Sequence, residues 1–237
     1  MAKSSTVVII PTYNEAESIR ILLTELLKLD ADFILVDDAS IDGTAGIAKE
    51  IAQSRLTVLS RPSKLGLGSA YIAGYTLALS QGYSTLIQMD ADGSHQVRDL
   101  VSMKKKFDSD QSIDLIIGSR WIPGGSVENW PKQREYLSRV ANKYSKLALG
   151  VKVNDMTAGF RIYRASLLKQ MKLDHITSEG YSFQIEMTRE AARIDANIVE
   201  YPITFVERSF GKSKMSPEIV REAILKVSQW GIRRLFP

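Results

Sequence analysis

Two aspartates separated by one residue, Asp90 and Asp92, are the side chains whose type and spacing most directly suggest chemistry. They follow the apolar run Thr85–Met89, and Gly93-Ser94 comes directly after them. The run predicts a short buried strand, and the glycine predicts the turn that ends it. Acidic side chains at the open end of a parallel strand lie where α/β sheets usually bind ligands. Carboxylates are hard oxygen ligands, so the pair suits Mg²⁺ or Mn²⁺ carrying a substrate diphosphate.

Two further polar clusters also follow predicted strands. Tyr13-Asn14-Glu15 comes after the apolar run 6–10, and Asp37-Asp38 comes after the run 33–36. The carboxyl ends of parallel strands lie on one edge of a sheet, so we expect these clusters to converge with the two aspartates. Each cluster alone also fits an ordinary helix-capping or turn role. The prediction of a site therefore depends on their meeting.

The elements that must position these residues alternate regularly over the first half of the chain. Apolar and β-branched runs predict strands at 6–10, 33–36, 56–59, 85–89 and 114–118. Helical periodicity predicts helices at 15–29, from residue 44, at 69–79 and at 97–107. This alternation predicts an α/β fold with a mostly parallel, Rossmann-like sheet and helices on both faces. No linker divides the 237 residues, so we expect a single domain.

The second half has a different pattern, with a Gly/Pro loop at 122–131 and a basic amphipathic helix at 132–149. A loop entering a short strand at 157–163, a helix at 181–193, an apolar strand at 197–206, a basic loop at 208–216 and an amphipathic helix at 217–235 follow. A basic amphipathic helix that contains Trp230 can lie in a membrane interface. Packing against the core explains the same pattern equally well.

Composition narrows the classes of protein. Hydrophobic residues make up 44% of the chain, which allows a substantial core and argues against global disorder. The absence of cysteine excludes disulfides and thiolate chemistry and fits a cytoplasmic protein. The two histidines, His95 and His175, are eighty positions apart, which disfavours a histidine metal site. The net charge of +4 suits polyanionic substrates or an anionic membrane, and no apolar stretch approaches the roughly 20 residues of a membrane span.

Several stretches resemble known enzymes. Val8–Glu15, Val36–Thr44 and Met89–Asp92 look like the inverting glycosyltransferases of the GT-A fold. Gly118–Arg120, Thr157–Arg161 and Glu207–Lys214 are similar to the dolichol-phosphate (polyprenol-phosphate) mannose synthases. The resemblance covers nearly the whole chain, and its motifs occur in the same order along the sequence.

The resemblance implies roles for the matching positions. In it, residues 1–120 form a nucleotide-sugar-binding half and residues 121–237 an acceptor-binding half. The nucleotide would contact Pro11, Tyr13, Glu15, Val36 and Asp38, and the diphosphate would meet Asp90, Ala91 and Asp92, the two aspartates through the metal. Arg208 and Lys214 would close over the donor phosphates, with Gly211 allowing the loop to act as a lid. The acceptor phosphate would bind Arg120, Arg134 and Ser138, and the catalytic group would be Asp90, Asp92 and Arg120.

The implied reaction transfers mannose from GDP-mannose to a polyprenyl monophosphate with inversion, the dolichyl-phosphate β-D-mannosyltransferase type (EC 2.4.1.83). A lipid phosphate is already ionised at neutral pH and needs no general base. It needs cationic positioning, which arginine forks supply. A divalent cation, Mg²⁺ or Mn²⁺, would neutralise the departing diphosphate at this acidic edge.

Three alternatives remain open at this point. Related polyprenol-phosphate glucosyltransferases share the pattern from Pro11 to Asp92, so UDP-glucose is a second possible donor. Asp90–Ser94 also resembles the nucleophile motif of aspartate-based phosphatases, although the later acids Asp155, Asp174 and Asp195 are isolated in the sequence. A nucleotide-binding module without catalysis is the third.

The expected location follows from the lipid acceptor. Many members of the resembling family carry C-terminal transmembrane helices, and this sequence ends without one. We therefore expect a cytoplasmic protein that is peripheral on the inner face of the membrane, contacting the membrane surface itself or a separate membrane-anchored partner protein. No nucleic-acid partner is expected.

Overall fold

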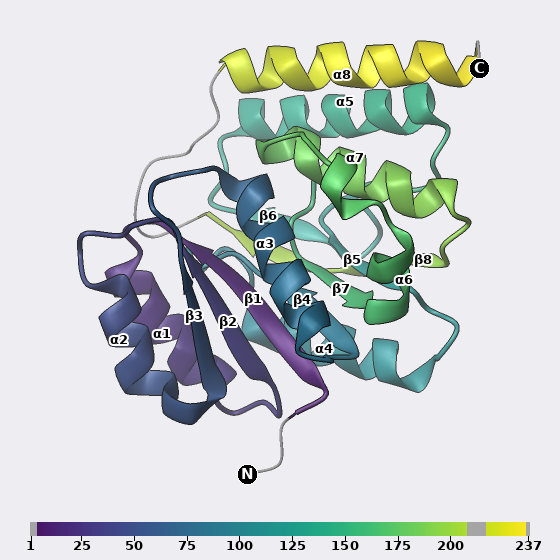
Figure 1. Cartoon of the computed structure of the whole chain (residues 1–237). Coiled ribbons are helices and arrows are strands. Elements are labelled where there is room, and N and C mark those ends of the chain that lie inside the picture. Colours follow the sequence, from purple (N-terminus) through teal and green to yellow (C-terminus); the bar gives the residue numbers. More distant parts are fainter. Residues whose placement is uncertain (1–3, 208–216, 236–237) are drawn as a thin grey trace.

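The computed structural model describes residues 4–207 and 217–235, and within them the chain forms a seven-stranded sheet and a two-stranded sheet. The strands of the large sheet are β1 (Thr6–Thr12), β2 (Asp32–Asp37), β3 (Leu56–Ser60), β4 (Thr85–Gln88), β5 (Leu115–Ser119), β7 (Arg161–Arg164) and β8 (Ile198–Pro202). Their order across the sheet is β3-β2-β1-β4-β7-β5-β8. The sheet is mostly parallel, as predicted (Figure 1).

One strand departs from the parallel pattern. β7 lies between β4 and β5 and is antiparallel to both, with Ile87 opposite Ile162 and Ile116 opposite Ile162. It carries Arg161, whose buried guanidinium donates to the carbonyl oxygens of Ala158, Met156 and Gln184. A charged residue inside a four-residue strand interrupts the apolar pattern, so the sequence predicted only a loop entering a short strand there.

Helices cover both faces, which confirms the predicted α/β class. Alternate residues of each central strand point to opposite faces: Val7 and Ile9 join one apolar cluster, and Val8 and Ile10 join the other. One face is covered by α1 (Ala16–Leu26), α2 (Thr44–Ala52) and α4 (Val97–Ser109). The other is covered by α3 (Leu67–Ser80), α6 (Ala165–Gln170) and α7 (Gly180–Arg193). The positions of these helices match the predicted ones within a few residues, except α6, which the sequence patterns did not indicate.

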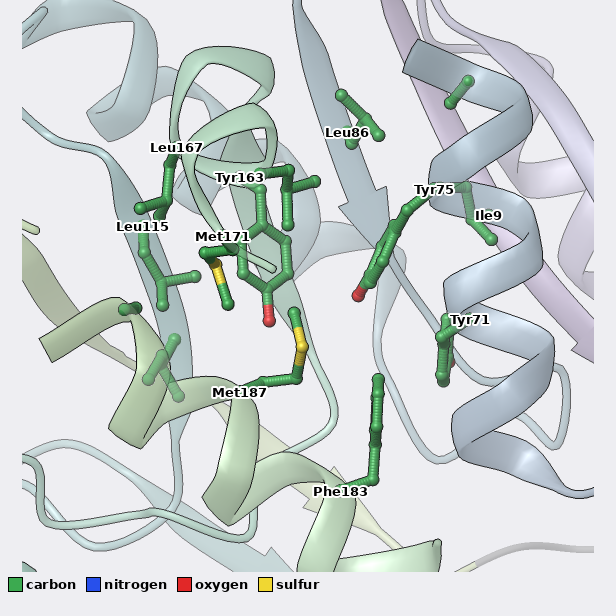
Figure 2. Packing of buried hydrophobic residues seen from close by; sticks show 14 of the residues in the cluster. Ile9, Tyr71, Tyr75, Leu86, Leu115, Tyr163, Leu167, Met171, Phe183 and Met187 are labelled. Carbon is green, nitrogen blue, oxygen red and sulfur yellow. The ribbon is translucent and has the colours of Figure 1, made fainter. Parts of the chain in front are cut away.

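Helix α3 lies unusually close to the sheet. A Cβ atom at Gly74 would come 2.4 Å from Ile9 Cγ2, so only glycine fits at this crossing. Tyr71 and Tyr75 of α3 then pack toward Phe183 of α7 and Tyr163 of β7 (Figure 2). These aromatic contacts fix the part of α3 that faces the strand ends.

The predicted strand 197–206 is divided in two, which corrects that prediction. β8 ends at Pro202, and β9 (Thr204–Val206) pairs instead with β6 (Ser126–Glu128), a strand inside the predicted Gly/Pro loop. Ile203 between them is buried and donates its backbone N–H to the carbonyl of Ser119. The small sheet therefore lies beside the carboxyl end of β5.

Two long helices form an outer layer at one end of the molecule. α8 (Pro217–Leu235) lies along α5 (Lys132–Leu149), and the two run in the same direction (Figure 1). The hydroxyl groups of Tyr144 and Ser228 are 2.7 Å apart across this contact. Val227 is buried and Trp230 packs against the core, so one side of α8 packs on the hydrophobic core. Across the described ranges 4–207 and 217–235, none of the helices combines the length and the apolar character of a membrane span.

Candidate active site

A cavity of about 460 Å³ opens at the carboxyl ends of β1, β4 and β5. Among the residues named from the sequence, its wall contains Pro11, Glu15, Asp90, Ala91, Asp92, Arg120 and Arg134. The expected meeting of the β1 and β4 ends is therefore observed, and it follows from the parallel pairing of these two strands. The Asp37-Asp38 cluster at the end of β2 is not part of this wall.

Asp90 and Asp92 lie at the turn that follows β4. Asp90 Oδ1 accepts a hydrogen bond from the hydroxyl of Tyr71 on α3, at 2.6 Å. Asp92 Oδ1 accepts the backbone N–H of Ser94, and Gly93 between them has a φ of 77° that suits glycine. The strand end and α3 together thus hold the acidic pair at the cavity wall.

His95 supports the turn through a hydrogen bond to the backbone of Asp90. Its Nδ1 accepts the backbone N–H of Asp90 at 3.2 Å, so the ring is neutral with its proton on Nε2. Its ring stacks on Phe160, with centroids 4.6 Å apart. Burial lowers the pKa of His95, and this outweighs the opposing effect of Asp90 and Asp92. His95 is therefore a neutral support for the Asp90 backbone.

The carboxylate pair fits a divalent cation that is shared with a phosphate ligand. In the described part of the chain, no three His, Cys, Asp or Glu side chains come together to hold a metal by themselves. Mg²⁺ in nucleotide sites usually takes one or two carboxylates and completes its shell with substrate phosphates and water. Asp90 and Asp92 are such a donor set.

On the nucleotide side, the residues named from the sequence divide into two groups. Tyr13 is not part of the cavity wall, but the ammonium of Lys64, which does line the cavity, is 4.4 Å from the Tyr13 ring centroid. Asp38 is buried, pairs with Arg61 and accepts the backbone N–H of Leu65. Its carboxylate therefore fixes the loop between β3 and α3 that carries Lys64.

Val36 is fully buried in the core. Its side chain contributes packing beneath α3 and does not line the cavity, so any contact with a nucleotide would have to come from its backbone.

Glu179, which the sequence patterns did not indicate, also lines the cavity. Its carboxylate accepts the backbone N–H groups of Gly68 and Ser69 at the start of α3. A Cβ atom at Gly68 would come 2.6 Å from the carbonyl oxygen of Ser178, so glycine permits this close approach. Only tertiary contact brings Glu179 here, because 110 positions separate it from Ser69.

Arg120 lines the cavity but is held firmly by Asp155. Its Nε and Nη2 donate to the two carboxylate oxygens at 2.7 and 2.6 Å, and Nη2 also donates to Thr157. Burial alone would lower the pKa of Arg120, but Asp155 outweighs that effect and raises it, so the guanidinium stays charged. Asp155, isolated in the sequence, is thus the partner of a predicted site residue.

Arg134 lies on the first turn of α5, with its guanidinium 4.0 Å from the ring centroid of Trp130, and it pairs with Glu207. Within the described residues, the buried Arg134 Nε and the Nε1 atoms of Trp121 and Trp130 have no hydrogen-bond acceptor. Buried donors without partners are uncommon in native proteins, so each such group is a candidate contact for a ligand. Arg134 and Trp130 both line the cavity, so their unpartnered N–H groups suit an anionic ligand there.

Ser138, one turn further along α5, is not part of the cavity wall. Its carbonyl oxygen accepts from Asn142, whose amide also donates to Thr157 Oγ1 at 3.0 Å. Thr157 does line the cavity. Ser138 is therefore connected to the site through Asn142 and Thr157. Arg208, Gly211 and Lys214, and with them the predicted lid, lie outside the described residues.

Comparison with known proteins agrees with this geometry. The profile of the glycosyl transferase family 2 matches residues 7–172. The polyprenol monophosphomannose synthase of Mycolicibacterium smegmatis is 46% identical over 96% of this chain and 87% of its own length. The undecaprenyl-phosphate mannosyltransferase of Micrococcus luteus is 47% identical over 94% of this chain and 93% of its own length. The chain therefore belongs to glycosyl transferase family 2.

Solved structures support the fold assignment. Glucosyl-3-phosphoglycerate synthase from Mycobacterium tuberculosis, solved with Mn²⁺, UDP-glucose and phosphoglyceric acid, superposes with a TM-score of 0.68 at 17% identity. The match covers 97% of this chain and 80% of that one. A second complex of the same enzyme, with Mn²⁺, UDP and glucosyl-3-phosphoglycerate, gives a TM-score of 0.62. At this identity the likeness shows a shared GT-A-type fold.

Proposed function

We propose that the protein transfers a mannosyl group from GDP-mannose to a polyprenyl monophosphate, with inversion at the anomeric carbon. Membership in glycosyl transferase family 2 establishes glycosyl transfer as the reaction class. The names of two relatives at 46% and 47% identity support mannose as the sugar and a polyprenyl phosphate as the acceptor. The cavity supports the same assignment through its two chemically different ends.

The acidic end suits the donor. Glu15, Asp90 and Asp92 line one part of the wall, and Lys64 lies beside the ring of Tyr13. When bound, a divalent cation at Asp90 and Asp92 would supply Lewis-acid stabilisation of the charge that collects on the diphosphate. Tyr71 keeps the Asp90 carboxylate oriented toward this role. Arg208 and Lys214, from the sequence resemblance, would add cations to the same phosphates.

The cationic end suits the acceptor. Arg134 and Trp130 present N–H donors that lack acceptors in the described part of the protein, and a phosphate supplies acceptor oxygens. Arg120 adds a fixed positive charge, although Asp155 already uses two of its nitrogens. Arg134 is therefore the main phosphate-binding residue in this proposal, and Arg120 is mainly a positioning residue.

The reaction follows from the two ends. A phosphate oxygen of the lipid attacks the anomeric carbon while the bond between that carbon and the donor diphosphate breaks. The electron pair of the broken bond leaves on the nucleotide, and the attacking oxygen carries no proton that must be removed. The position of His95 agrees with a reaction that needs no general base, because its Nδ1 already accepts the backbone N–H of Asp90.

The observation that carries the proposal is one cavity that joins an acidic strand end to two donors, Arg134 Nε and Trp130 Nε1, that lack an acceptor among the described residues. The test is a donor panel of GDP-mannose, UDP-glucose and other nucleotide sugars with one polyprenyl phosphate, read by mass spectrometry of the lipid. The proposal predicts a mannosylated lipid phosphate from GDP-mannose. If only UDP-glucose gave a product, a glucosylated lipid, the proposed donor would be wrong. If nucleotide sugars bound without any lipid product, the proposed transferase activity would be wrong.

The aspartate-phosphatase alternative loses support from the structure. Such an enzyme needs later acids near the nucleophile to hold Mg²⁺, and Asp155 is committed to Arg120. Asp174 is exposed beside His175 and does not line the cavity.

We also place the protein at the inner face of the cytoplasmic membrane, because its proposed acceptor is dissolved in a bilayer and its proposed donor is water-soluble.

A further inference from the structure

Helices α5 and α8 expose a continuous set of large apolar side chains. On α5 these are Tyr136, Leu137, Val140 and Leu147, and on α8 they are Ile224, Leu225 and Ile232. We call this set the α5–α8 face. Leu147 is 68% exposed and Leu225 is 60% exposed, whereas the opposite sides of both helices are buried or half-buried.

Helical spacing and the packing of the two helices place these residues on one surface. Tyr136, Val140 and Leu147 recur at intervals of four and seven residues, so they share one side of α5. Tyr144 contacts Ser228, and Gly231 lies against the carbonyl of Ala148, so the two helices stay in contact over several turns. Figure 1 shows them side by side at one end of the molecule.

The charge of the protein is concentrated on the same two helices. α5 carries five basic residues and one acidic residue, and α8 carries four basic and two acidic residues. The pair therefore has a formal charge of +6, whereas the whole chain has +4. The remainder of the protein is net acidic. Lys143 and Arg221 are exposed on these helices.

The face is also continuous with the proposed acceptor site. Arg134, which binds the acceptor phosphate in our proposal, and Leu137 are three residues apart at the start of α5. The 18 residues of α5 extend about 27 Å from there. A polyprenyl chain leaving the cavity at Arg134 would thus meet apolar side chains bordered by cations.

We propose that the α5–α8 face docks the protein onto an anionic membrane surface. The apolar residues enter the boundary between headgroups and acyl chains, and the basic residues pair with anionic headgroups. A bilayer matches both features, because it offers hydrocarbon and negative charge over a broad, unspecific area. This inference rests on the proposed lipid acceptor for its purpose, but its evidence is the apolar and charged surface itself.

The test is flotation of the purified chain with vesicles of phosphatidylcholine alone or mixed with phosphatidylglycerol. Wild type floats with the anionic vesicles and much less with the neutral ones, and added salt releases it. Leu137→Gln with Leu147→Gln lowers the partition coefficient at least about tenfold on anionic vesicles. Lys143→Glu with Arg221→Glu also lowers it at least about tenfold there, with little change on neutral vesicles.

Matched controls lie elsewhere on the surface. Ile41→Gln removes an apolar side chain that is 92% exposed, and Lys105→Glu reverses an exposed charge on α4. Both controls should float like wild type. The docking proposal is overturned if wild type stays unbound, or if the face variants and the controls float equally.

Activity on two acceptors separates docking from catalysis. The face variants should keep wild-type turnover with a short, water-soluble isoprenyl phosphate and lose turnover with a long polyprenyl phosphate in anionic vesicles. Equal turnover of wild type and variants on both acceptors would contradict docking, as would a requirement for an added membrane-protein fraction. Absence of transfer to both acceptors by wild type would overturn the proposed function, and flotation would still decide docking.

Discussion

The hydroxyl of Tyr71 donates a hydrogen bond to Asp90 Oδ1 at 2.6 Å, joining the fully buried side of α3 to the acidic end of β4. The Tyr71 ring packs against the rings of Tyr75 and Phe183, with centroid distances of 6.1 and 6.0 Å (Figure 2). Burial, and then the nearby Asp90 charge, raise the pKa of Tyr71 well above its usual value. The hydroxyl therefore stays a proton donor, and the core itself sets the orientation of a proposed metal ligand.

Tyr71→Phe should weaken metal binding more than it weakens the fold. The ring keeps its stacking contacts, so the free energy of unfolding should fall by only about 1 kcal/mol. Loss of a hydrogen bond behind a ligand typically reduces metal affinity by about tenfold or more. The measurement is the Mg²⁺ or Mn²⁺ concentration needed for half-maximal transfer.

Tyr75→Phe is the matched control for that substitution. Tyr75 lies one turn along α3, and its hydroxyl donates to Gln88 inside the protein. Its removal should reduce stability and leave the metal requirement unchanged. The same metal requirement in both variants and wild type would mean that Tyr71 does not position Asp90.

Arg120→Ala should be strongly destabilising. The substitution leaves the fully buried Asp155 carboxylate without its cation, a change that typically costs 3–5 kcal/mol. The double variant Arg120→Met with Asp155→Leu removes both charges and should recover most of that loss. Urea unfolding of the two variants and wild type provides the comparison. If Arg120→Ala unfolded at the same urea concentration as wild type, Arg120 would have no structural role and its role would be purely catalytic.

Arg134→Ala should weaken use of the lipid phosphate and leave donor binding largely intact. The loss of a charge-assisted contact to phosphate should raise the KM for the acceptor by about tenfold. Arg139→Ala, which removes an exposed arginine at 4.1 Å from the Trp121 ring, is the control on the same helix. Calorimetric binding of the donor and transfer kinetics with varied acceptor give the two readouts. Equal losses in donor binding and in use of the acceptor would show that Arg134 has a structural role.

Asp42 should contribute to stability in a pH-dependent way. Burial tends to raise its pKa, but hydrogen bonds from Thr44 and the backbone of Ala16 and Thr44 lower it below 3.8 overall. Its stabilisation is therefore fully present above pH 3.8 and disappears as the pH falls through the lower folded pKa. Asp42→Asn should reduce stability at neutral pH by a few tenths of a kcal/mol, since the group is mostly exposed, and should flatten the acid dependence. An acid limb identical to that of wild type would contradict this.

The parallel part of the fold could be predicted because its signal is local. β1, β2 and β4 are continuous apolar runs, and the helices between them repeat apolar residues at helical spacing. β7 was less visible because its buried Arg161 depends on carbonyl oxygens supplied by distant residues. The sequence pattern does not separate β9 from β8, because Pro202 and Ile203 do not interrupt the apolar run where the chain passes from one sheet to the other.

The site could be predicted in part for the same reason. Glu15, Asp90 and Asp92 lie within four residues of strand ends, so their convergence follows from topology. Contacts between distant segments bring three further residues to the site: Glu179, Trp130 and Asp155. The pattern of a single sequence gives no signal for such contacts. The amphipathic pattern of α8 fits both membrane contact and core packing, and the helix has a buried side and an exposed apolar side.

The central claim is that the acidic strand end binds the donor through a divalent cation. The direct measurement is mannosyl transfer to polyprenyl phosphate by the purified protein in excess chelator, followed by restoration with Mg²⁺ or Mn²⁺. The account predicts loss of the lipid product under chelation and its return with added metal, with Asp92→Asn failing to respond. Full turnover in excess chelator would contradict it.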